Sequence, residues 1–153
     1  MSDTVDTPLS CKPRTLFGLD YGTRKLGVAS GQTLTRTAMG IALLPVKNLE
    51  PEWEDFDKLV ATWKPDAFVV GMPFNMDGSE SDMTAKARKF MQQLATRYGK
   101  PCHEVDERLS TREAREISRN NAKLTGKRIN DRAKVDALVA QLLLESWFEQ
   151  VSE

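Results

Sequence analysis

A continuous apolar run at residues 67–71 is the feature that most constrains the fold of this chain. A strand without polar alternation is buried on both faces, which is typical of the parallel sheets of α/β proteins. Helical periodicity flanks the run on both sides, at 53–63 behind Pro51 and at 83–98 before Gly99. The centre of the chain therefore predicts a helix–strand–helix unit within a layered α/β domain.

Shorter segments complete the predicted sheet. Residues 15–19 and 26–30 are separated by a stretch rich in turn-forming residues, so they are expected to pair as a β-hairpin. Residues 38–44, stopped by Pro45, add a third strand, and 102–106 add the last. We therefore predict a mixed five-stranded sheet, antiparallel among the first three strands and parallel among the first, fourth and fifth, with helices on both faces.

Two more helices are expected after the last strand. Ser110 and Glu113 have the spacing of a capping box, and the helix that they begin fades near 120–121. A basic loop at 123–130 then precedes a closing helix over 131–150. We predict a disordered tail at residues 1–13 and a single domain over 14–150, since 153 residues is the size of one ordinary domain.

Composition limits the class of protein. With 40% hydrophobic and 29% charged residues, the chain is expected to fold around a core, which excludes disordered and collagen-like proteins. Two cysteines are too few for a disulfide framework, and we find no signal peptide. No segment approaches the roughly 18 apolar residues needed to span a bilayer. The expectation is a soluble, cytoplasmic protein without a membrane partner.

The charges are unevenly distributed, although Lys+Arg and Asp+Glu balance at 22 each. Residues 86–134 hold 14 basic and 6 acidic side chains, whereas residues 1–85 and 135–153 are both net negative. Such asymmetry favours a surface that faces a polyanion, with Lys/Arg-rich but merely solvated helix faces as the alternative.

Carboxylates stand at the predicted carboxyl ends of strands. Asp20 closes the first strand, and Asp106 and Glu107 end the last one. Ligands of such sheets bind at these ends, where the strand order reverses. Each position also has an ordinary interpretation, since Asp20 could cap a turn and the Asp106–Glu107 pair could form surface ion pairs.

A further carboxylate, Asp136, lies on the apolar face of the closing helix. A charge there costs several kcal/mol unless it is paired, protonated or bound to a cation. Either a basic partner such as Arg108 or Lys134 compensates Asp136, or it approaches Asp20 across the end of the sheet. The apolar residues that share its helix face are Ala140, Leu143 and Trp147.

Three converging carboxylates without a His/Cys cluster would form a site of hard oxygen ligands, suited to Mg²⁺ or Mn²⁺ rather than zinc. Beside a basic surface, the chemistry that such a site favours is two-metal hydrolysis of phosphodiester bonds. In that reaction the protein supplies position and charge and no covalent nucleophile.

Several motifs resemble the YqgF/RuvX family, which comprises Holliday junction resolvase-like proteins and pre-16S rRNA nucleases. The resemblance extends from about Thr15 to Gln150, and its specificity comes from the order and spacing of the whole set. The motifs lie at residues 19–23, 27–29, 69–73, 75–78, 106–111 and 134–136.

The resemblance implies a ribonuclease H-like fold. It also implies that Asp20, Glu107 and Asp136 are the catalytic metal ligands, with Asp106 as the alternative to Glu107. In the wider superfamily an acid commonly ends the fourth strand, whereas here that strand ends in the sequence at 71–73, which has no acid. Phosphate contacts are expected from Arg108, Lys127, Arg128 and Lys134.

The leading functional hypothesis is a metal-dependent nuclease, using Mg²⁺ or Mn²⁺, that processes the 5′ end of precursor 16S ribosomal RNA. Its expected partners are precursor rRNA and the small ribosomal subunit, with the chain acting as a monomer or weak dimer. One alternative is a resolvase of four-way DNA junctions, which needs paired active sites. Others are a non-catalytic rRNA-binding assembly factor and an actin-like ATPase, although that class needs two such domains to enclose ATP.

Overall fold

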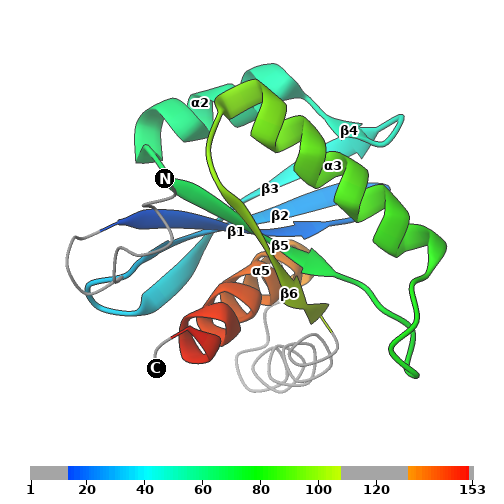
Figure 1. The fold of residues 1–153 in the computed structure, drawn as a ribbon. Coiled ribbons are helices and arrows are strands. Elements are labelled where there is room, and N and C mark those ends of the chain that lie inside the picture. The colour runs from blue at the N-terminus through cyan, green and yellow to red at the C-terminus, as the bar shows by residue number, and fades with distance from the viewer. Residues whose placement is uncertain (1–13, 108–130, 152–153) are drawn as a thin grey trace.

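The computed structural model describes residues 14–107 and 131–151, and at 131–137 it describes the backbone alone. The predicted tail at 1–13, and the helix and basic loop predicted between 110 and 130, lie outside these residues. In the described part of the chain, three helices pack on a six-stranded sheet (Figure 1). In chain order the elements are β1 (Thr15–Tyr21), β2 (Lys25–Gln32), β3 (Thr37–Lys47), β4 (Glu50–Pro51), α2 (Trp53–Trp63), β5 (Ala67–Met72), α3 (Asp82–Tyr98), β6 (Cys102–Asp106) and α5 (Asp131–Gln150).

The sheet is mixed, as predicted, with the strand order β4-β3-β2-β1-β5-β6. The pairs β1–β2, β2–β3 and β3–β4 are antiparallel, whereas β5 pairs parallel with both β1 and β6. The prediction of five strands is short by one, because the two-residue strand β4 was not recognised. This strand is too short to show any periodicity, and only its pairing with the end of β3 defines it.

The strand β3 also continues past Pro45, where the sequence predicted its end. The next residue, Val46, donates its N–H toward the neighbouring hairpin, to the carbonyl of Arg24 at 2.8 Å. Because successive N–H groups of a strand point to opposite sides, the nitrogen of Pro45 points to the outer side, where β4 pairs only with residues 46 and 47. A proline is tolerated there because no ladder hydrogen bond is lost.

Helices cover both faces of the sheet, with α2 and α3 on one side and α5 on the other (Figure 1). Every residue of β5 is buried, in agreement with the interpretation of its apolar run. The core accordingly has two layers. The layer under α2 and α3 contains Phe17, Phe56, Phe68 and Phe90, and the layer under α5 contains Leu16, Val69, Leu143, Leu144 and Trp147.

The helix α5 lies directly on the backbone of β1 at Gly18. A Cβ atom at this position would lie 2.8 Å from the carbonyl oxygen of Ala140 and 2.8 Å from the Cβ of Leu144. Neither atom is the flexible end of a side chain, so the helix itself would have to move to admit a methyl group. Gly18 therefore sets the distance between α5 and the sheet.

The substitution Gly18→Ala is expected to lower the free energy of unfolding by about 3 kcal/mol, as overpacking of a rigid contact does. Gly99→Ala is the matched control, because a Cβ there meets nothing within 4 Å and only the left-handed φ of +64° is strained. That strain costs about 1 kcal/mol. Urea unfolding of both variants measures the difference, and an equal loss in the two would contradict the close packing at Gly18.

Candidate active site

The carboxyl ends of three parallel strands meet at one edge of the sheet. The last paired residues of β1 and β5 are Leu19 and Val70, so Asp20 lies beside Gly71. On the other side of β5, the strand β6 ends at Asp106. The structure thus brings the acids of the first and last strands to the same edge, on either side of the end of β5.

Asp20 lies on the face of the sheet that α5 covers. The side-chain position of Gly18 points at α5, as its close contacts show. Side chains two residues apart in a strand share a face, so Asp20 shares this one. The strand β1 runs two residues past its predicted end, because Asp20 still pairs with Gly27 of β2. Asp20 is therefore paired with β2, directly follows the last residue of β1 that pairs with β5, and is partly buried.

Asp106 lies on the opposite face. Glu104, two residues earlier in β6, accepts hydrogen bonds from Arg88 of α3, so its side chain is directed to the α2/α3 side. Asp106 shares that side by strand alternation. Val105, between them, belongs instead to the core layer under α5. The sheet therefore separates Asp106 from Asp20.

Glu107 follows the end of β6 and returns to the α5 face. Its Oε2 atom lies 3.2 Å from the place that a Cβ of Gly71 would occupy. The nearest atom to this place is Cδ1 of Leu143 from α5, at 2.6 Å, which identifies the face. Glu107 thus lies over Gly71, while Asp20 lies beside Gly71 on the neighbouring strand. The missing side chain of Gly71 leaves the space in which the carboxylate of Glu107 lies.

The direction of α5 is fixed by its contacts with two glycines. Gly18 is approached by the carbonyl of Ala140, whereas Gly31 is approached by the ring of Phe148. Gly31 pairs with Leu16, which lies two residues farther from the carboxyl end of β1 than Gly18 does. Proceeding along α5 therefore leads away from the site edge, and the beginning of the helix lies nearest to that edge.

This direction carries the start of α5 toward Asp20. Asp136 precedes Ala140 by about one helical turn, a rise of about 6 Å. Asp20 follows Gly18 by two strand residues, about 6.6 Å, in the same direction from the contact between Gly18 and Ala140. The backbone at Asp136 is thus placed at the same edge as Asp20 and Glu107, although the side chain of Asp136 is not among those described.

The remaining predicted residues are not tested by the structure. Lys134 lies in α5, where only the backbone is described, and Arg108, Lys127 and Arg128 lie outside the described residues. Among the side chains that are described, no group of three His, Cys, Asp or Glu is placed to hold a metal ion. The only histidine, His103, contacts Trp147 with a ring separation of 5.1 Å.

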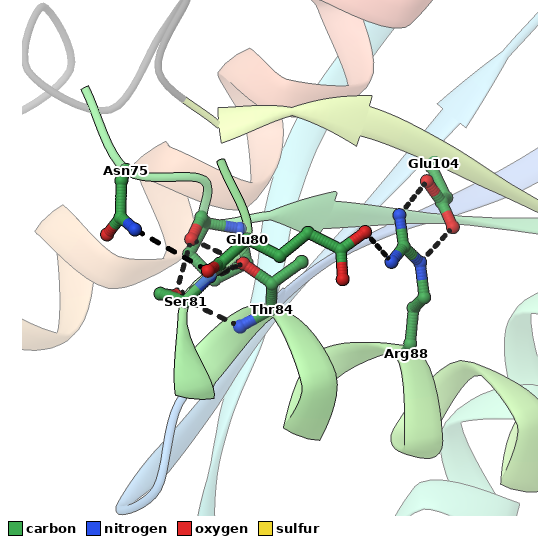
Figure 2. Close-up of polar contacts among 7 residues, drawn as sticks. Asn75, Glu80, Ser81, Thr84, Arg88 and Glu104 are labelled. Carbon is green, nitrogen blue, oxygen red and sulfur yellow. Dashed lines mark hydrogen bonds and ion pairs between the residues drawn. The ribbon is translucent and has the colours of Figure 1, made fainter. Parts of the chain in front are cut away.

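Sequence reasoning missed a network of polar side chains on the α2/α3 face of the sheet, opposite to the face of Asp20 and Glu107, which Figure 2 shows. Ser81 caps α3, and its side chain accepts a hydrogen bond from the backbone N–H of Thr84. Arg88, one turn later, forms ion pairs with Glu80 and with Glu104 of β6. The hydrogen bond to Glu104, and to a smaller extent the one to Glu80, raises the pKa of Arg88, so its guanidinium stays charged. The signal was the Ser–Thr spacing of a capping box at 81–84.

The order of strands, the helices on both faces and the acids at the parallel edge define a ribonuclease H-like α/β fold, as predicted. Two solved structures share the fold. T. thermophilus RuvC in complex with Holliday junction substrate matches with a TM-score of 0.53 at 15% identity, over 91% of this chain and 96% of that one. The Fowlpox virus resolvase in complex with Holliday junction DNA matches with a TM-score of 0.55 at 11% identity, over 91% and 99%.

Sequence comparison identifies the family. The family model for RuvX, described as Holliday junction resolvase, matches residues 14–150, so the chain belongs to the RuvX family, as its motifs indicated. It is 46% identical to an Azotobacter vinelandii protein over 90% of this chain and 95% of the relative. It is 47% identical to one from Alcanivorax borkumensis over 87% and 94%. Both relatives are named "Putative pre-16S rRNA nuclease".

Family membership makes the chain a hydrolase that acts on nucleic acids, which confirms the predicted class of enzyme. In the described part of the chain, no helix has the length and apolar character needed to cross a membrane.

Proposed function

We propose that the chain is a divalent-metal-dependent nuclease that hydrolyses phosphodiester bonds at the 5′ end of precursor 16S ribosomal RNA. The observation that carries the proposal is the placement of Asp20 and Glu107 on one face of the sheet, on either side of the end of β5. The names of relatives that are 46% and 47% identical support the choice of substrate. Such a role belongs in the cytoplasm, on or near the small ribosomal subunit.

The chemistry of the two acids fits a hard divalent cation. Both donors are carboxylates, and the described strand ends add no thiolate or imidazole beside them. Oxygen ligands of this kind suit Mg²⁺ or Mn²⁺ rather than zinc. Asp20 and Glu107 would hold the metal, with Asp136 as the third ligand from the start of α5. When bound, the metal supplies activation of water and stabilisation of the leaving oxygen.

The residues of the chain itself hold and orient the substrate. Asp20 is fixed in a strand that is paired on both sides, so its carboxylate is preorganised at the strand end. The excess of basic side chains at 86–134 supports phosphate contacts from that part of the chain. We assign these contacts to Arg108, Lys127, Arg128 and Lys134, which would position a strand without reading its sequence.

The second candidate function is cleavage of four-way DNA junctions. The description of the matching family model favours it. A symmetric junction is cut by two active sites related by a two-fold axis, so this function requires a dimer, whereas trimming of one RNA end requires only a monomer or weak dimer.

The test is cleavage of a 5′-extended 16S rRNA precursor, with a four-way DNA junction assayed in parallel and the oligomeric state measured by sedimentation. With Mg²⁺ or Mn²⁺ the precursor is expected to be cut, and removal of the metal with EDTA is expected to abolish cleavage until metal is restored. Cleavage of the junction alone, by a dimer, would establish the resolvase instead. Binding of rRNA without cleavage of either substrate would indicate a non-catalytic assembly factor.

A further inference from the structure

A loop beside the candidate site exposes one large apolar side chain. Residues 73–81 connect β5 to α3, starting directly after the strand end that carries Gly71. At the tip of this loop, 87% of the surface of Met76 is exposed, more than for any other large hydrophobic residue that the structure describes as exposed. Single exposed apolar residues are common, so the argument depends on how this one is held.

Hydrogen bonds close the tip of the loop on both sides of Met76. The backbone N–H of Asn75 donates to the carbonyl of Ser79 at 2.9 Å, and its side-chain amide donates to the Ser79 hydroxyl at 3.0 Å. Gly78, with a φ of 89°, donates its N–H to the carbonyl of Asn75. Asp77 accepts from both the N–H and the hydroxyl of Ser79. Met76 therefore extends from a turn whose backbone is fixed by hydrogen bonds.

The base of the loop is fixed as well, as Figure 2 shows. The hydroxyls of Ser81 and Thr84 both donate to the carbonyl of Pro73, at 2.9 Å and 2.8 Å, which joins the two ends of the loop. Arg88 then links the last part of the loop to the strand that leads to Glu107, through its ion pairs with Glu80 and Glu104. These contacts thus fix the loop relative to β6, the strand that precedes Glu107.

The charge of the loop excludes a role as a phosphate clamp. Residues 73–82 contain no Lys or Arg. The acid nearest the tip, Asp77, accepts hydrogen bonds from Ser79, and Glu80 shares the guanidinium of Arg88 with Glu104. Beside these acids, the exposed apolar side chain of the loop is the thioether chain of Met76, which is unbranched and polarizable. Apolar side chains of this kind insert between or against nucleobases.

We propose that Met76 packs against the face of a nucleobase close to the cleaved bond and so favours substrates in which that base is unstacked. The inference rests on the proposed nuclease function and names a contact of the same site. Met76 follows Gly71, over which Glu107 lies, by five residues, so their Cα atoms lie at most about 18 Å apart. Even at the 3.4 Å per nucleotide of a stacked duplex strand, this reach covers at most about five nucleotides from the cleaved bond.

The experiment places the fluorescent base 2-aminopurine at each of these positions in the precursor RNA and measures its emission on binding in EDTA. The wild type is expected to raise the emission at one position within the window. Met76→Ala is expected to lose this rise and to bind about tenfold more weakly, because the apolar surface that the methionine buries against the base is lost. Met76→Leu is expected to restore both.

Met39→Ala is the matched control, because Met39 is the same residue type, 56% exposed, in β3 on the other side of β1 and β2. It is expected to behave as the wild type. If Met76→Ala and Met39→Ala are indistinguishable, the contact is refuted, whether or not the enzyme cleaves RNA. A different result is that the wild type cleaves no RNA with metal present, yet shows the emission change that Met76→Ala lacks. In that case the proposed catalysis fails and the base contact stands.

Discussion

The substitution Asp20→Asn is expected to abolish cleavage of precursor rRNA while the fold is retained. Asparagine keeps the shape of the side chain and leaves the backbone pairing of β1 with β2 and β5 in place. It removes a negative charge from the end of β1, beside the end of the central parallel strand β5. Loss of a ligand to a catalytic metal is worth several kcal/mol in the transition state, so we expect the rate to fall by about a thousandfold, or about 4 kcal/mol.

Single-turnover cleavage at saturating Mg²⁺ measures this loss, and titration with Mn²⁺ followed by electron paramagnetic resonance measures the affinity for the metal. Asp55→Asn is the control, since Asp55 is exposed in the first turn of α2, on the other face of the sheet. It is expected to keep the wild-type rate and metal affinity. An Asp20→Asn variant that folds, and still cleaves at more than a tenth of the wild-type rate, would remove Asp20 from the catalytic centre.

Much of the fold could be predicted because its signals are local. The apolar run of β5 is typical of a strand in a parallel sheet, and the helical periodicity on either side of it predicts the two flanking helices. Neither signal depends on other segments of the chain. The strand β4 and the passage of β3 through Pro45 were missed because both depend on pairing between strands. Whether a proline ends a strand is decided by the side to which its nitrogen points, which the sequence does not show.

The site was predicted less completely. The sequence located acids at the ends of two strands, but it could not choose between Asp106 and Glu107. Strand alternation puts them on different faces only once the packing of α5 and α3 identifies each face. The sequence shows that Gly71 ends its strand without an acid, yet its role as the space beneath Glu107 follows only from three-dimensional contacts. The capping box at 81–84 was overlooked because Thr84 stands where a Glu or Gln is usual.

Adjacent acids in one segment provide the sharpest test of the site. Glu107→Gln is expected to reduce the cleavage rate by at least a hundredfold, because it removes a charge from the face that Asp20 shares. Asp106→Asn is expected to change the rate less than threefold, since the sheet separates this side chain from Asp20. Both changes are nearly isosteric and remove one charge within one residue of each other, so a general electrostatic effect on RNA binding would alter the two alike.

Rates at saturating metal and substrate, together with Mn²⁺ affinity, distinguish the possible results. A loss in Glu107→Gln alone, with weaker metal binding, supports the α5 face as the catalytic face. A loss in Asp106→Asn alone would instead place the second acid beside α3 and would require the end of β6 to turn over when substrate or metal binds. Because Gly71 accommodates Glu107 with an oxygen only 3.2 Å from its missing Cβ, the first result is the one that the packing favours.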